Sequence, residues 1–90
     1  MTLIDVAPIP VPSPNHESRR LVLHLAQNVT AARHAAGLTQ RQLADAAELS
    51  RATVHLIEAG TCDPRVSTIA HLARALRLSP LELLEPRAAS

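Results

Sequence analysis

The sequence of 90 residues contains no phenylalanine, tyrosine or tryptophan. Hydrophobic residues nevertheless make up 47% of it, so any core must be built from leucine, isoleucine, valine and alanine. Leucine and alanine are strong helix formers, whereas strands favour aromatic and β-branched side chains. Because a chain of this length forms one small domain with little room for a catalytic cleft, we expect a single all-α domain.

Glycine and cysteine are also scarce. The two glycines, Gly37 and Gly60, cannot supply a phosphate-binding loop or a nucleophile elbow. Cys62 is the single cysteine and has no CxxC partner, and no two of the five histidines are four residues apart. We therefore predict no enzyme activity, no metal site and no cofactor.

Lysine is absent, and all nine basic residues are arginine, which leaves a formal net charge of +1. This charge is too small to indicate a nucleic-acid partner, although arginine is suited to bidentate contacts with phosphate or guanine. The N-terminus lacks the basic and continuous apolar regions of a signal peptide, and no segment is long enough to span a membrane. A lone cysteine fits a reducing compartment. We expect a cytoplasmic protein with no membrane partner.

Alternating prolines mark the N-terminal part of the chain. They stand at Pro8, Pro10, Pro12 and Pro14. Proline removes backbone donors and favours extended chain, so residues 1–17 are predicted to form an arm, residues 18–86 the domain and residues 87–90 a tail. The arm is either a solvated tail or a segment whose Leu3, Ile4 and Val6 pack on a partner subunit.

Apolar residues recur at spacings of three and four in successive segments, which is typical of helices. Thr39 with Gln42 and Ser79 with Glu82 form capping-box patterns, and Ser50 is a further N-cap. The five predicted helices run from Ser18 to Ala36, from about Gln40 to Ala47, from Ser50 to about Ala59, along the stripe of Ile69, Leu72, Ala73 and Leu76, and from Ser79 to about Leu84.

The second and third predicted helices, within residues 40–59, are short and are joined by only three residues. Helices this short need support from the rest of the domain, so the pair is expected to be a rigid unit. Steps of 100° per residue place Val54 and Ile57 on the inner side of the later helix. The outer side then carries Arg51, Ala52, His55, Leu56 and Ala59. This outer side either enters a DNA major groove or is an ordinary solvated face.

Five motifs follow one another between about Leu25 and Leu84: "GLTQRQLA" at 37–44, "LSRATVHLIEAG" at 49–60, glycine and proline at 60 and 64, "STIAHLARAL" at 67–76 and "SPLELL" at 79–84. With these motifs in this order, the chain resembles the helix-turn-helix domains of the lambda Cro and cI repressor type, also called the Xre family. The resemblance implies a five-helix, lambda-repressor-like domain that binds DNA, regulates transcription and is usually dimeric.

The resemblance also implies roles for individual residues. Gln40 matches a glutamine that contacts the DNA backbone, and the neighbouring Arg41 can add a phosphate contact. Arg51 and Ala52 match the main base-reading positions; Arg51 can donate two hydrogen bonds to guanine, whereas Ala52 offers only a methyl contact. The predicted DNA-binding residues are Gln40, Arg41, Arg51, Ala52, Thr53, His55, Leu56 and Thr61.

Two of these positions leave alternatives open. Leu56 falls where a family member can carry a polar base-reading side chain; an outward leucine either meets thymine methyl groups or marks a protein contact. Thr61 and Arg65 flank the loop that follows the third predicted helix. They are either phosphate partners or solvated loop residues.

Three further expectations follow from the resemblance. Arg33 and Glu58 match a partly buried ion pair that joins the first helix to the end of the third. Glu48 stands where the family most often has glycine, at a position that tends to need a positive φ. Finally, the chain has more leucine near its last helix, at positions 78, 81, 83 and 84, than we expect one domain to bury. We therefore predict a dimer interface formed by Leu78, Leu81 and Leu84.

These observations support two functions. The first is a sequence-specific transcriptional regulator, in particular a repressor, that binds a pseudo-palindromic site on double-stranded DNA as a homodimer. The alternative is an antitoxin-like or adaptor protein that binds another protein, such as a toxin, through its arm or Leu56. The near-neutral charge favours the alternative, whereas Arg41, Arg51 and the resemblance favour DNA.

Overall fold

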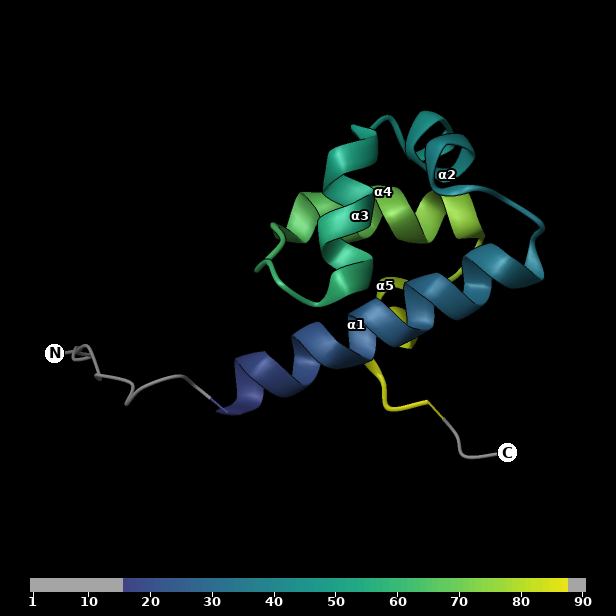
Figure 1. The fold of residues 1–90 in the computed structure, drawn as a ribbon. Coiled ribbons are helices and arrows are strands. Elements are labelled where there is room, and N and C mark those ends of the chain that lie inside the picture. The colour runs from purple at the N-terminus through teal and green to yellow at the C-terminus, as the bar shows by residue number, and fades with distance from the viewer. Residues whose placement is uncertain (1–15, 88–90) are drawn as a thin grey trace, which may run out of the picture.

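The computed structural model describes residues 16–87, which form five helices and no strand (Figure 1). The helices are α1 (His16–Ala35), α2 (Gln40–Ala47), α3 (Arg51–Ala59), α4 (Val66–Leu76) and α5 (Pro80–Leu84). The predicted all-α fold is confirmed. α1 begins at His16, ahead of Ser18, and its first turn contains Glu17, which the helix dipole favours there. Positions 3, 4 and 6 of the predicted arm lie outside the described residues.

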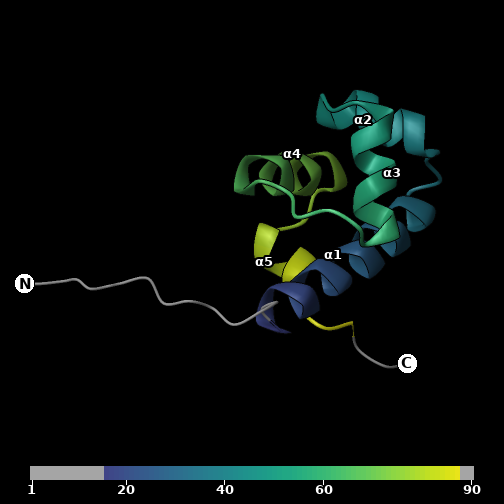
Figure 2. The same ribbon diagram turned by 60° about the vertical axis from the view of Figure 1, so that its left-hand side comes forward.

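The helices pack as a small cluster in which α1 contacts α3 and α5, while α4 contacts α2 and α5. Both views place α5 beside α1 and α2 on the opposite side of the molecule (Figure 1 and Figure 2). α2 and α3 also contact each other. The helix-turn-helix pair therefore rests on two supports, with α1 behind α3 and α4 behind α2.

The core is made only of aliphatic side chains contributed by every helix. Its buried members are Leu25, Val29, Leu43, Ala44, Ala47, Val54, Ile57, Leu72, Ala73 and Leu83. The alanines let helix backbones approach closely. The space between the helices is then small enough to be filled without aromatic rings. No polar or charged residue among those described is fully buried. Polar interactions that fix helix positions consequently lie at the rim of the core.

Local capping chemistry sets the helix ends. The Thr39 hydroxyl accepts a hydrogen bond from the Gln42 backbone N–H at 3.0 Å, and the Gln42 side chain accepts one from the Thr39 N–H at 2.9 Å. Ser79 and Glu82 form the same reciprocal pair at the start of α5. These contacts satisfy backbone N–H groups that have no partner inside the helix, so both predicted capping boxes are present.

The turn between α2 and α3 has the geometry expected for a glycine, although the residue is Glu48. Its φ is 61°, in the left-handed region, and its backbone N–H donates to the carbonyls of Ala44 and Asp45. Gly60 ends α3 in the same region with a φ of 71°. A Cβ at Gly60 would lie 3.4 Å from the Leu23 side chain, an ordinary van der Waals contact, so the positive φ and not the available space favours glycine here.

The leucines near α5 correct one expectation. Leu83 is fully buried, and Leu78 and Leu84 are half-buried against the same core. Only Leu81 extends into solvent, with 71% of its surface exposed. The domain thus buries more of this leucine than we expected, because α5 lies in the angle between α1 and α4. We predicted the interface at Leu78, Leu81 and Leu84 from an excess of leucine side chains that the domain would leave exposed. Only Leu81 is such a side chain.

Two polar side chains of α1 hold the end of this short helix. The Asn28 amide donates to the carbonyls of Leu83 at 2.8 Å and Glu85 at 2.7 Å. The His24 ring nitrogen Nδ1 lies 3.1 Å from the Leu84 carbonyl oxygen. A five-residue helix is unstable alone, so these contacts and the burial of Leu83 account for its position.

Replacing Glu48 with glycine should stabilise the domain, because glycine adopts a positive φ without the steric cost of a Cβ. We expect Glu48→Gly to exceed Glu48→Ala in free energy of unfolding by about 0.5–1 kcal/mol, measured by chemical denaturation. The alanine variant is the control, since it keeps the Cβ and removes the exposed contact between Glu48 and Arg74. Equal stability of the two variants would mean that the turn is unstrained.

Candidate nucleic-acid interface

The outer side of α3 is presented to solvent while its inner side is anchored. Val54 and Ile57 are buried in the core. The five outer residues, Arg51, Ala52, His55, Leu56 and Ala59, are all exposed. The turn before α3 is only three residues long, and α2 is anchored by its own buried Leu43, Ala44 and Ala47. The outer side of α3 is therefore exposed and its inner side anchored in the core, as the 100° spacing predicts.

Arg41 and Arg51 are free to contact a ligand. Both are exposed, and neither has an ion-pair or hydrogen-bond partner within residues 16–87. Arg41 lies in the first turn of α2 and Arg51 is the first residue of α3. Two unpaired guanidinium groups thus stand at the start of adjacent helices, where they can bind anionic or acceptor groups.

Thr53 has a capping role. Its backbone N–H donates to the Ser50 hydroxyl at 3.0 Å, and its own hydroxyl lies 2.8 Å from that of Ser50. The side chain is half-buried. Thr53 therefore helps to fix the first turn of α3, the turn that begins with Arg51.

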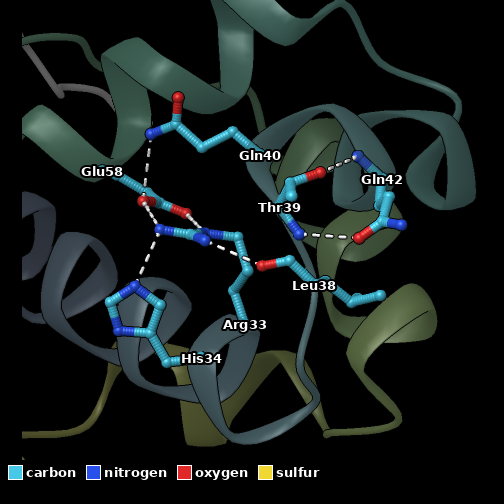
Figure 3. A network of polar contacts seen from close by, with 7 residues as sticks. All are labelled: Arg33, His34, Leu38, Thr39, Gln40, Gln42 and Glu58. Carbon is cyan, nitrogen blue, oxygen red and sulfur yellow. Dashed lines mark hydrogen bonds and ion pairs between the residues drawn. The ribbon is translucent and has the colours of Figure 1, made fainter.

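Gln40 is engaged within the protein. Its side-chain amide donates to Glu58 at 3.2 Å, and the residue is half-buried (Figure 3). This contact fixes the start of α2 relative to α3. The sequence pattern did not indicate it, because the two residues are 18 positions apart.

Arg33 and Glu58 form a bidentate ion pair between α1 and α3 (Figure 3). Arg33 Nε donates to Glu58 Oε2 at 2.6 Å, and Arg33 Nη2 donates to Glu58 Oε1 at 3.0 Å. The two side chains are only 12% and 7% exposed. Arg33 also donates to the carbonyl of Leu38 at 2.8 Å, just before α2 begins. One arginine therefore ties together α1, the entry to α2 and the end of α3.

The pair stays ionised because its hydrogen bonds outweigh its burial. Burial by itself raises the pKa of the Glu58 carboxyl, since the charged form loses hydration. Hydrogen bonds from Arg33, Gln40 and Thr30, together with the charge of Arg33, lower that pKa below its ordinary value of 4.5. The hydrogen bond to Glu58 raises the pKa of Arg33. The sequence pattern did not identify Thr30 as a member of this network.

The loop between α3 and α4 carries Thr61 and Arg65, both exposed. The Thr61 hydroxyl makes only a long contact of 3.4 Å with the Leu56 carbonyl. Arg65 precedes α4 at its N-cap position, and its side chain makes no capping bond. Both side chains are therefore accessible next to the exposed face of α3.

Groups suited to other chemistry are sparse in the described part of the chain. Within residues 16–87, no three histidine, cysteine, aspartate or glutamate side chains gather where they could hold a metal ion. Burial, and to a smaller extent the neighbouring Asp63, raises the pKa of the Cys62 thiol, which disfavours the reactive thiolate. None of the described helices is both long and apolar enough to cross a membrane.

Comparison with known proteins agrees with this geometry. A family model described as a helix-turn-helix domain matches residues 24–85, which include all of α2 and α3. The chain belongs to this helix-turn-helix family. The chain shares its all-helical arrangement with structures of Xre-type regulators, and these matches support DNA-binding transcriptional regulation as its function class. A search of curated proteins gave no match.

Solved structures extend this comparison. The restriction-modification controller protein C.AhdI from Aeromonas hydrophila is 34% identical with a TM-score of 0.66, and the match covers 69% of this chain and 94% of that one. A hypothetical transcription factor, NHTF from Neisseria, is 29% identical with a TM-score of 0.72 and 88% coverage of both chains.

A third structure supports the fold alone. An HTH_3 family transcriptional regulator from Vibrio cholerae is 23% identical with a TM-score of 0.69, and the match covers 73% of this chain and 37% of that one. The five-helix arrangement therefore recurs at low identity, within a longer chain as well as in small proteins.

Breaking the ion pair at one side should destabilise the helix-turn-helix domain strongly. Glu58→Gln leaves Arg33 poorly hydrated and without a counter-charge, and we expect a loss of about 3 kcal/mol in the free energy of unfolding at neutral pH. Glu48→Gln, which removes the exposed pair with Arg74, is the control and should cost less than about 0.5 kcal/mol. Similar stability of the two variants would contradict the role given to Glu58.

Acidification should reduce the difference between wild type and Glu58→Gln. The pKa of Glu58 is lower in the folded than in the unfolded chain, so the stabilisation is complete above the ordinary pKa of 4.5. It is lost as the pH falls through the lowered folded-state pKa. Denaturant titrations across this acidic range measure the effect, and a difference that stays constant would assign the destabilisation to packing alone.

Proposed function

We propose that this chain is a sequence-specific transcriptional repressor that binds a pseudo-palindromic DNA site as a homodimer, with α3 in the major groove. The observation that carries the proposal is the exposed outer face of α3, led by an unpaired Arg51 and held by a buried inner face and the Arg33–Glu58 pair. An α-helix fits the major groove, and its first residues are the ones that reach base edges in this type of domain.

The two free arginines have different tasks in this proposal. Arg51 projects from the start of α3 and donates two hydrogen bonds to guanine O6 and N7. Arg41, at the start of α2, binds a backbone phosphate and sets the position of the domain on the duplex. The exposed Thr61 and Arg65 of the α3–α4 loop are candidates for further phosphate contacts. Base contacts select the sequence, and phosphate contacts supply affinity.

A second subunit is part of the proposal because one recognition helix reads only a few base pairs. Leu81 on α5 and Val66 on α4 are exposed by 71% and 83%. Between α1, α4 and α5 lies a mainly apolar groove of about 230 Å³, lined in part by Leu21, Ile69 and Leu84. A second copy covering this side would hold two recognition helices about 34 Å apart, facing successive major grooves.

The likeness to C.AhdI supports regulation as the task of this domain itself. The aligned residues span 94% of that controller protein, so its name describes little beyond the shared domain. The similarity does not identify the genes that this chain regulates. An adjacent pair of genes for a restriction enzyme and a methyltransferase would place it in the same setting.

Arg51→Ala should weaken specific binding by about 1–3 kcal/mol and relax the base preference at one position in each half-site. Arg41→Ala should instead weaken binding to all sequences alike and lower the salt dependence by about one counterion for each phosphate that Arg41 no longer neutralises. Titrations of a selected operator and a random duplex at several salt concentrations separate the two effects.

Arg87→Ala provides the control for the removal of a positive charge. Arg87 follows α5, and the chain there lies on the α1 side, away from α2 and α3, in both views (Figure 1 and Figure 2). It should leave the base preference unchanged. If selection from random duplexes with the wild-type protein enriches no motif, the proposal of DNA recognition is wrong, and the protein-binding alternative gains support from the exposed Leu56.

Leu81→Asp should separate the dimer, because it places a charge in the proposed apolar interface. Leu81 is the suitable position, since Leu84 also packs against the core of its own domain. We expect sedimentation at micromolar concentration to show a dimer for wild type and for a control, Leu23→Asp, and a folded monomer for Leu81→Asp. A wild-type monomer both with and without operator DNA would exclude the homodimer.

A further inference from the structure

The outer face of α3 has an unusual division of polar and apolar side chains. Successive steps of 100° put Ala52 and Ala59 along the middle of this face, Arg51 and His55 on one flank and Leu56 on the other. All five are exposed. The middle and one flank therefore present only carbon atoms beyond the backbone, and hydrogen bonding is confined to the flank of Arg51 and His55.

Leu56 is the largest apolar group on this face. It is 45% exposed, although it belongs to a helix whose inner residues, Val54 and Ile57, are almost completely buried. Its neighbours one turn away, Ala52 and Gly60, are too small to cover it. An exposed leucine on the flank of this helix face can be covered by a partner that offers an apolar group.

The backbone of Leu56 is part of the hydrogen-bonded cap that ends α3. Its carbonyl oxygen accepts hydrogen bonds from the N–H groups of Gly60 and, at 3.3 Å, Thr61. These contacts close the left-handed cap of α3 at the turn that carries Leu56. The helix turn that carries the side chain is thus fixed, which favours contact with a small group such as a methyl.

We propose that Leu56 recognises the 5-methyl group of a pyrimidine in the DNA major groove, and that the small Ala52 permits its close approach. The inference rests on the proposed function and adds a chemical identity to one base of each half-site: a thymine faces Leu56, beside the guanine that Arg51 contacts. Thymine is the standard base that presents a methyl group in the major groove. A leucine side chain gains by covering that methyl group and excluding water from it.

The same side chain discriminates against the other bases. In the major groove cytosine presents an amino donor, guanine two acceptors, and adenine an acceptor and an amino donor. Covering these groups with leucine removes their water without returning a hydrogen bond, which is unfavourable. His55 and Arg51 lie on the opposite flank of α3, so they do not supply the missing partner. The preference for a methyl group therefore has an attractive and a repulsive component.

The test replaces thymine with uracil, one position at a time, in an operator obtained by selection. This change removes the methyl group and keeps every hydrogen-bonding atom. For wild type we expect one thymine in each half-site to be sensitive, with Kd rising about fourfold for one substitution and about fifteenfold when both half-sites are changed. Binding is measured by fluorescence anisotropy with operator duplexes of identical length.

Protein variants assign the effect to the side chain. In Leu56→Ala the sensitive position should become indifferent to the change from thymine to uracil. Leu23→Ala is the matched control, because Leu23 is a leucine of similar exposure, 48%, on α1. That variant should keep the wild-type sensitivity. At the same position, 5-methylcytosine should bind more tightly than cytosine for wild type and equally for Leu56→Ala.

The outcomes separate this inference from the proposed function. If a motif is selected and depends on Arg51, but uracil is tolerated at every thymine, methyl recognition by Leu56 is wrong and the regulator proposal stands. A uracil effect that persists in Leu56→Ala also contradicts the assignment to Leu56. If no motif is enriched at all, the proposed function and this inference fail together.

Discussion

The position of α3 depends on one bidentate ion pair. The core consists of aliphatic side chains, whose attraction is non-directional and so allows many relative helix orientations of similar energy. Arg33 and Glu58 add the missing direction, since the guanidinium donates two hydrogen bonds to the carboxylate, at 2.6 and 3.0 Å. Gln40 and the Leu38 carbonyl bond to the same two groups, so α2 takes its position from the same pair. The surface that faces outward is therefore specified by a polar network at the edge of an apolar core.

Features with a local physical cause could be predicted from the sequence. The starts of α2 and α3 follow from Thr39, Gln42 and Ser50, whose hydroxyl and amide groups act on backbone groups three positions away. The start of α1 was missed because His16 and Glu17 precede the first apolar residue and so carry no periodic signal. Glu17 instead pairs with Arg20, one turn later, at 3.2 Å. The positive φ of Glu48 was expected from the resemblance alone, because nothing in the residue itself requires it.

Features that depend on distant residues could not be predicted in this way. The leucine pattern near α5 gives the number of apolar groups but not the surface available to receive them, and α1 and α4 together buried more than expected. The partners of Asn28 lie 55 and 57 positions along the chain. In the candidate site, the resemblance identified Arg33 with Glu58, but it gave no reason to include Thr30 or to place Gln40 in the same network.

The low net charge limits how this domain can find and hold DNA. Sequence-independent binding depends on the number of phosphates neutralised, and a chain with a formal charge of +1 offers little general attraction. In the proposed complex, a larger share of the affinity must therefore come from contacts that fit one sequence. A rigid α3 suits that requirement, because apolar contacts such as those of Ala52 and Leu56 gain free energy only at close approach. Small side chains along the middle of its outer face permit this approach, while Arg51 at the edge supplies the directional hydrogen bonds. Weak general attraction and a largely carbon-lined helix face thus both suit the proposed mode of recognition, a close shape fit at few bases.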